Sequence, residues 1–274
     1  MLYTIIQPSL PLQAFVKDYL LLHFVFDNNV PVPIKPFPAS TLQCLVFYVR
    51  GAVTACDPRT GQCKRFPSIA LNGSLTTRLD YSISPDCLLL SVGFHPGALS
   101  RFLRLPLTAF VDERVDAEAI LNPEIHQAQE QMANAPSYEG IVQIAEAYLW
   151  KRIQSLHTAF QPIDRVARRI AENKNVLTIE KMAREAFLSI SQFERRFMQL
   201  TGITPKFFAR ITRFYNAYQL KDSNPNADWL SIALETGYYD YQHLVKDFKQ
   251  FANVTLASLL EAQARSPERI LNFG

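Results

Sequence analysis

The amino-acid sequence predicts an α+β fold, in which a β-rich N-terminal domain that also contains helices precedes an all-α domain. Eleven of the seventeen prolines lie before Val111, and only four lie beyond Phe160. Short apolar runs rich in β-forming residues occur in the first part, whereas helical spacing of apolar residues prevails in the second. The length of 274 residues suits two domains of ordinary size. We place them at residues 1–159 and 160–274.

Four segments of the N-terminal part lead to the β prediction. Residues 41–49 and 87–94 are short apolar runs that contain many β-forming side chains. The sequence Asp-Pro-Arg-Thr-Gly at 57–61 is typical of a turn between two strands and predicts a hairpin. Four prolines within residues 31–38 predict an extended stretch that cannot lie in the middle of a sheet. Together these segments predict an antiparallel sandwich or barrel.

Helical segments follow in the second half of the N-terminal domain. We expect short helices over 98–103 and 124–133 and a longer one over 137–155. In the longest segment, apolar residues at helical spacing form one face: Ile141, Ile144, Ala145, Tyr148 and Leu149. Such a face either packs on the predicted sheet or pairs with a second copy of the chain. Pro162 suits the first turn of a new helix, which supports the proposed domain boundary.

Charge and hydropathy restrict the classes of partner. The net charge is +3, but residues 160–274 carry +4 and the remainder carries −1. This asymmetry permits nucleic-acid binding by the C-terminal domain without requiring it. No apolar run approaches the ~18 residues of a membrane span. The N-terminus also lacks the basic and apolar regions of a secretory signal, so we expect a cytoplasmic protein without a membrane partner.

Cysteine and histidine usage argues against a metal or cofactor site. The four cysteines favour free and mostly buried thiols, with a Cys56–Cys63 bridge or a metal site as the alternative. The first 115 residues contain only His23 and His95, which do not form a His-x-His pair. The chain contains no nucleophile elbow, phosphate loop or dinucleotide fingerprint. We therefore predict no enzyme activity, no catalytic residues, no cofactor and no metal.

An internal repeat is the most specific feature of the sequence. The pattern Met-Ala-x-Glu at 182–185 recurs as Ile-Ala-x-Glu at 232–235, an offset of 50 residues. Downstream, Phe193, Phe197 and Leu200 recur as Leu244, Phe248 and Phe251, an offset of 51 residues. One extra residue therefore lies in the turn of the second copy.

Capping residues divide each copy into helix, turn and helix. In the first unit, about 178–200, Thr178 caps one helix, and Ser189 with Gln192 gives the capping-box signature of the next. Gly202 ends that second helix. In the second unit, about 228–251, the corresponding caps are Asp228 and Asp240. A helix from about Pro205 to Leu220 joins the units.

This pattern predicts helix-turn-helix geometry, in which the second helix of each unit enters the DNA major groove. The repeated residues at 193, 197 and 200, and at 244, 248 and 251, form a largely aromatic stripe on the second helix of each unit. If these stripes are buried, the opposite faces carry side chains that suit base edges. The candidate DNA-binding residues are Ser191, Gln192, Glu194 and Arg195 in the first unit, and Tyr241, Gln242, His243 and Lys246 in the second. Ile190 and Val245 add apolar groups for thymine methyls. Two such helices would enter successive grooves roughly 34 Å apart.

Two segments resemble the AraC/XylS family of bacterial transcription regulators: residues 188–205 and residues 232–249. The resemblance covers about 163–260 and implies a DNA-binding domain with two helix-turn-helix units. Family contact positions carry over to Ser191, Glu194 and Arg195, and to Gln242, His243 and Lys246. The second unit departs from the family where Asn253 and Leu256 replace the usual Gly and Pro. Lys246 replaces a usual Arg and lacks its two-pronged hydrogen-bonding geometry.

A weaker resemblance concerns the N-terminal domain. Residues 93–103, followed by Leu105-Pro106, are similar to a segment of the β-rich, cupin-like sensor domains of some of these regulators. The resemblance implies sensing of a small-molecule effector or protein partner, or homodimerisation through this domain or the 137–155 helix. We therefore expect a sequence-specific regulator that binds double-stranded DNA, and that contacts RNA polymerase if it is an activator. The alternative is a small-molecule-binding or protein-interaction module with degenerate DNA binding.

Overall fold

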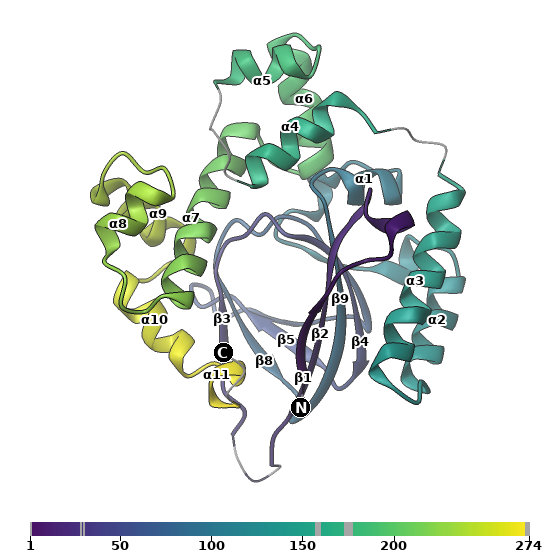
Figure 1. Ribbon diagram of the computed structural model, residues 1–274. Helices are drawn as coiled ribbons and strands as arrows, with labels where there is room; N and C mark the ends of the chain where they lie inside the picture. Colours follow the sequence, from purple (N-terminus) through teal and green to yellow (C-terminus); the bar gives the residue numbers. More distant parts are fainter. Residues whose placement is uncertain (1, 28, 30, 157–159, 173–177, 272–274) are drawn as a thin grey trace.

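The computed structural model describes residues 2–27, 29, 31–156, 160–172 and 178–271, and it has a β-rich N-terminal part and a helical C-terminal part (Figure 1). The described strands are β1 (Leu2–Ile6), β2 (Val16–Val25), β3 (Lys35–Phe37), β4 (Gln43–Arg50), β5 (Val53–Cys56), β6 (Cys63–Arg65), β7 (Ile69–Asn72), β8 (Leu79–Ile83), β9 (Asp86–Phe94) and β10 (Arg114–Asp116). The α+β prediction is confirmed. The predicted domain boundary, at 159, lies outside the described residues.

The strands form two antiparallel sheets. One has six strands in the order β1-β2-β9-β4-β7-β10, and the other has four in the order β3-β8-β5-β6. The predicted strands at 41–49 and 87–94 appear as β4 and β9, which pair in the middle of the larger sheet. Pro36 lies in β3 at the edge of the smaller sheet, as expected of a residue without a backbone N–H.

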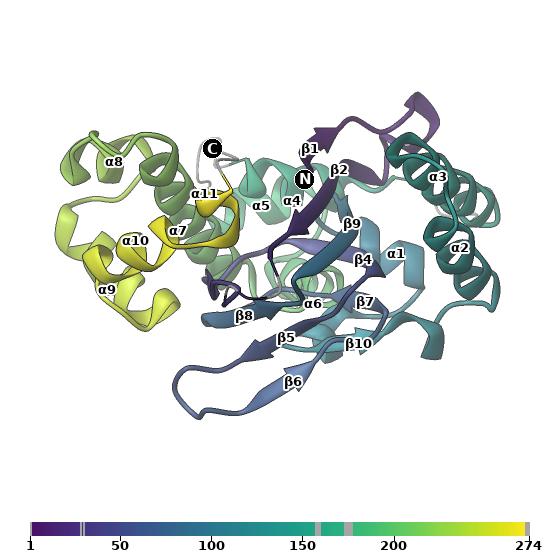
Figure 2. The same ribbon diagram turned by 90° about the horizontal axis from the view of Figure 1, so that it is seen from below.

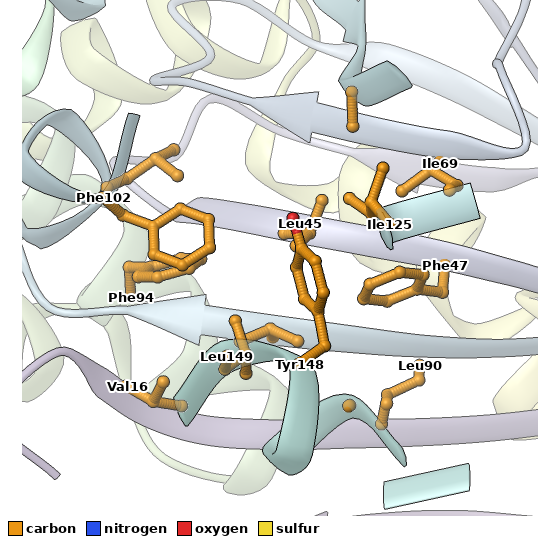
Figure 3. Packing of buried hydrophobic residues seen from close by; sticks show 14 of the residues in the cluster. Val16, Leu45, Phe47, Ile69, Leu90, Phe94, Phe102, Ile125, Tyr148 and Leu149 are labelled. Atoms are coloured by element: carbon orange, nitrogen blue, oxygen red, sulfur yellow. The ribbon is translucent and has the colours of Figure 1, made fainter. Parts of the chain in front are cut away.

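Helices cover one face of the larger sheet. They are η1 (Leu10–Leu12), α1 (Ala98–Leu103), η2 (Leu107–Phe110), η3 (Ala117–Ala119), α2 (Glu124–Ala133) and α3 (Tyr138–Gln154). Side chains of β4 alternate, so that Leu45 and Phe47 are buried on the side of α2 and α3 (Figure 3). Tyr148 and Leu149 of α3 pack in the same cluster. The predicted apolar face of α3 therefore packs within its own domain, and pairing of α3 with a second chain stays a prediction.

A disulfide corrects the expectation of four free thiols. The predicted hairpin at 57–61 connects β5 and β6, and its register places Cys56 directly opposite Cys63. Their Cα atoms are 4.1 Å apart, which brings the two sulfur atoms together in a disulfide. Spacing in the sequence could not give this register. Cys44 and Cys87 are free, and burial raises the pKa of the Cys87 thiol to about 11.

The C-terminal part has one core shared by both repeats. Its helices are α4 (Pro162–Ala171), α5 (Ile179–Glu185), α6 (Ile190–Thr201), α7 (Pro205–Ser223), α8 (Trp229–Glu235), α9 (Tyr241–Ala252), α10 (Leu256–Ala264) and α11 (Pro267–Ile270). On α7, Phe208 packs edge-to-face on Phe197 of α6, and Phe214 packs on Phe248 of α9, with ring centroids 5.4 and 4.8 Å apart. The predicted connecting helix thus joins the two units. None of the described helices combines the length and apolar character needed to span a membrane.

The two units lie at different corners of the molecule. In Figure 1, α5 and α6 lie above the sheets, while α8 and α9 lie to one side of them, and α7 runs between the two pairs. From below, α8, α9 and α10 lie at the end of the molecule opposite α2 and α3 (Figure 2).

Phe197 supplies a test of this core. Its side chain is fully buried between α6 and α7, so Phe197→Ala removes a ring and leaves a cavity. We expect the substitution to lower the unfolding free energy by about 3–5 kcal/mol, measured by urea denaturation of the full chain. Met198→Ala is the matched control, because this neighbouring side chain is exposed, and its effect should stay within about 0.5 kcal/mol. Equal effects of the two substitutions would contradict the proposed packing.

Candidate nucleic-acid interface

The caps of the first unit form as predicted. Thr178 Oγ1 accepts a hydrogen bond from the Lys181 backbone N–H at 3.4 Å, which begins α5. Ser189 Oγ accepts from the Gln192 N–H at 3.3 Å, and Gln192 Oε1 accepts from the Ser189 N–H at 3.2 Å. These reciprocal bonds are the predicted capping box, and they fix the start of α6.

The second unit uses carboxylates in place of hydroxyls. Asp228 accepts from two backbone N–H groups, those of Leu230 at 2.9 Å and Ser231 at 3.0 Å. Asp240 accepts from the His243 N–H at 2.8 Å. A carboxylate at a helix N-terminus also interacts favourably with the helix dipole. Both predicted caps are confirmed.

The second helices of the two units, α6 and α9, are called the recognition helices below. Their C-terminal ends are equivalent despite different residues. Gly202, at the end of α6, has a φ of +88°, and Asn253, at the end of α9, has a φ of +56°. Asn is among the few residues other than Gly that adopt this left-handed conformation readily. Leu256 then begins α10 after the cap Thr255, as Pro205 begins α7. The departures from the family pattern at Asn253 and Leu256 therefore leave the local geometry intact.

All the predicted contact residues lie on exposed surface of the two recognition helices. The aromatic stripes that contain Phe193 and Phe197 in α6, and Phe248 in α9, are buried. The exposed residues are Ser191, Gln192, Glu194 and Arg195 on α6, and Tyr241, Gln242, His243 and Lys246 on α9. The fold thus brings four of them together on each helix. Their contact with DNA and the separation of the two faces stay predictions.

Two of these side chains already have partners inside their own unit. The Oε1 atom of Gln192 takes part in the capping box, which leaves its amide NH₂ group as the available donor. The Nδ1 atom of His243 lies 2.9 Å from Asp240 Oδ1, and hydrogen bonds from His243 lower the pKa of that carboxyl. Both side chains are therefore held in place before any ligand binds.

A buried carboxylate fixes α9 on the connecting helix. Asp247 points inward from α9 and accepts a hydrogen bond from Tyr238 at 3.1 Å. Arg210 and Arg213 of α7 form ion pairs with the same carboxylate. Burial raises the pKa of Tyr238 well above its usual value, and this ring lies inside the domain. The outward orientation of α9 thus depends on polar contacts as well as on its aromatic stripe.

The turns carry two exposed aromatic residues that are not among the predicted DNA-binding residues. Phe187, between α5 and α6, is 84% exposed, and Tyr239, between α8 and α9, is 88% exposed. Phe187 has a φ of +55° and corresponds in the repeat to Gly237, whose φ is +83°. A left-handed conformation costs a residue other than Gly roughly 1–2 kcal/mol. Superposition of the two repeats in sequence would have identified both residues, because Tyr239 is the extra residue of the second turn.

One loop of the β-rich domain contacts the C-terminal ends of both recognition helices. In this loop, residues 73–78 between β7 and β8, Ser74 Oγ donates to the backbone oxygen of Thr201 at 2.9 Å. Thr77 Oγ1 accepts from Asn253 Nδ2 at 2.7 Å. At the end of α6, a Cβ on Gly202 would lie 2.8 Å from the backbone oxygen of Leu107, so the fold leaves no room for a side chain there. Sequence patterns do not reveal such long-range contacts.

A buried ion pair also joins the two domains. Arg101 of α1 pairs with Asp164 of α4, and both side chains are almost fully buried. Asp164 also accepts from the Gln161 N–H at 2.7 Å, which begins α4. Burial raises the pKa of Asp164 and lowers that of Arg101, since both charges are removed from water. Nearby, Arg168 donates to the backbone oxygen of Ala14.

Comparison with known proteins agrees with this geometry. Residues 182–262 match the family described as Helix-turn-helix domain. The C-terminal region is an AraC-type helix-turn-helix domain. The match runs from α5 to α10, so both recognition helices of the AraC-type domain lie within it. In the chain, the β-rich part precedes this helix-turn-helix domain.

The β-rich part matches a domain without an assigned role. Residues 4–116 match a Domain of unknown function (DUF6597). Among solved structures, ToxT from Vibrio cholerae is similar, with 11% identity over 90% of this chain and 99% of that chain and a TM-score of 0.49. The AraC-like transcriptional activator CuxR has 13% identity over 73% of this chain and 77% of that chain, with a TM-score of 0.30. No curated protein matches the sequence.

The folded protein is expected to become less stable in acid through His95. Burial, aided by the positive charges of Arg168 and Lys17, lowers the pKa of His95 to about 4. The unfolded chain, with a histidine pKa of about 6.5, therefore binds a proton before the folded chain does. This contribution to stability is complete above pH ~6.5 and is lost as the pH falls towards ~4. Urea midpoints of wild type should fall more steeply across this range than those of His95→Gln, and parallel slopes would contradict the assignment.

Proposed function

We propose that the protein binds specific double-stranded DNA sequences through α6 and α9 and that the β-rich domain modulates this binding. One observation carries the proposal: two capped helix-turn-helix units each bury an aromatic stripe and leave a polar face exposed at the start of the second helix. That end of a recognition helix contacts base edges in the major groove. The boundary between the β-rich and DNA-binding domains is proposed at residue 159.

The exposed side chains divide into base and backbone contacts. Arg195 presents the planar fork that recognises guanine, and Glu194 is an acceptor for the amino group of cytosine. Gln192 and Gln242 offer amide groups for adenine, and Lys246 offers a point charge. Ser191, Tyr241 and His243 complete the proposed set. Exposed cations on or beside the recognition helices suit phosphates: Lys181, Arg184, Arg196 and Lys249.

The shared loop supports a route from the β-rich domain to DNA. Because residues 73–78 contact the ends of both α6 and α9, a shift of this loop changes the placement of both helices at once. A small-molecule effector or protein partner that binds the β-rich domain and alters the loop would change DNA affinity by this route. We also propose a cytoplasmic location, homodimerisation through this domain or α3, and contact with RNA polymerase if the protein is an activator.

DNA binding is tested with the full chain and a pool of mixed-sequence duplexes. Fluorescence anisotropy should detect binding that weakens steeply, by roughly 10³-fold if six phosphates are contacted, between about 50 and about 200 mM salt. Lys249→Ala is the control, since removal of one phosphate contact reduces the slope of log affinity against log salt by about one. No salt-dependent binding would favour the alternative, a small-molecule-binding or protein-interaction module with degenerate DNA binding.

Arg195 tests sequence recognition separately from affinity. With a duplex selected by the wild-type protein from a random pool, Arg195→Ala should lose about 1–3 kcal/mol of discrimination at one base pair. Arg196→Ala, its exposed neighbour, should weaken binding to all duplexes alike. Competition titrations against single-base variants of the duplex measure both effects. Unchanged discrimination in Arg195→Ala would remove this residue from the set that contacts bases.

A further inference from the structure

The two most exposed aromatic side chains among the described residues lie in the turns of the two units, one in each. Phe187 is 84% exposed and lies two residues before Ser189, the cap of α6, whereas Tyr239 is 88% exposed and lies directly before Asp240, the cap of α9. Single exposed apolar residues are common on protein surfaces. An exposed aromatic residue in the turn of each unit is a more specific feature, because each lies beside a proposed contact surface.

The fold does not require an aromatic residue at either turn. Phe187 adopts a left-handed conformation that Gly237 provides in the other unit, and no heavy atom lies within 4 Å of a Cβ built at Gly237. The Phe187 ring therefore adds strain without contributing to the core. Tyr239 is an additional residue of the second turn, and its ring packs edge-on to His243 with centroids 6.3 Å apart. Strain that the fold does not need often accompanies function.

We propose that Phe187 and Tyr239 contact DNA and extend each recognition surface with an apolar group. The inference rests on the proposed function, because it assigns these residues to the same interface. The turn lies beside the first residues of the recognition helix, which enter the groove. Phe187 and Ile190 are both exposed and precede Ser191 by four residues and one residue. The apolar group that base pairs present in the major groove is the thymine methyl. Tyr239 packs on His243 and donates its hydroxyl to a backbone phosphate.

Removal of the thymine methyl tests the contact of Phe187. The probe is a duplex that the wild-type protein selects from a random pool, with each thymine replaced in turn by deoxyuridine. At one position, deoxyuridine should weaken wild-type binding about fourfold, the factor that corresponds to one buried methyl group. Phe187→Gly should bind the parent duplex more weakly and should no longer distinguish thymine from deoxyuridine there. Its melting temperature should not fall, because Gly relieves the left-handed strain.

Control variants separate this contact from general effects of apolar surface. Leu10→Ser removes a similarly exposed apolar side chain from the β-rich domain and should bind DNA as wild type does. Tyr239→Phe should lose less affinity than Tyr239→Ser, since it keeps the ring that packs on His243. If wild type selects no duplex, the proposed function and this inference both fail. If wild type binds a selected duplex, and both Phe187→Gly and Tyr239→Ser bind it as tightly as wild type does, the inference alone fails.

Discussion

A single loop of the β-rich domain contacts both recognition helices. Residues 73–78 hydrogen-bond to the C-terminal ends of α6 and α9, which leaves the opposite ends of these helices exposed. The loop is itself held by Asp112, whose carboxylate accepts from the backbone N–H and the hydroxyl of Thr76, both at 2.6 Å. Asp112 adopts a left-handed φ of +59° to do so. One element of the β-rich domain therefore holds the AraC-type domain at two equivalent points.

The buried ion pair between Arg101 and Asp164 affects the orientation in which the two domains dock more than the free energy of docking. A buried charge pair gains little net free energy, because the cost of desolvation offsets the attraction between the charges. Loss of one partner leaves an unpaired buried charge, and this penalises any docking that separates Arg101 from Asp164. Asp164 also begins α4, so the residue that pairs with the β-rich domain fixes the first helix of the next domain as well. Local helix formation and domain docking thus depend on the same carboxylate.

Features that follow local rules could be predicted from the sequence. The caps Ser189 and Asp240, the aromatic stripes and the connecting helix depend on residues within a few turns of one another, and all are found as expected. The exposure of the candidate contact residues follows from the same helical spacing. The order of strands and the contacts of loop 73–78 depend on residues far apart in sequence, for which spacing gives no information. The expectation of free thiols at Cys56 and Cys63 was wrong for a related reason, since the disulfide between them depends on the register of a hairpin.

The two units are equivalent in backbone but not in chemistry. In the first, Arg195 offers a planar fork and Gln192 keeps a free amide group, so this helix is equipped to distinguish bases. In the second, Lys246 offers only a point charge and His243 is already bonded to Asp240. Because point charges attract phosphates without regard to sequence, α9 is better suited to affinity than to selectivity. Under the proposed function, a loop that contacts both helices couples a more selective helix to a less selective one. Correct placement of α6 on the duplex would then also determine where α9 contacts it.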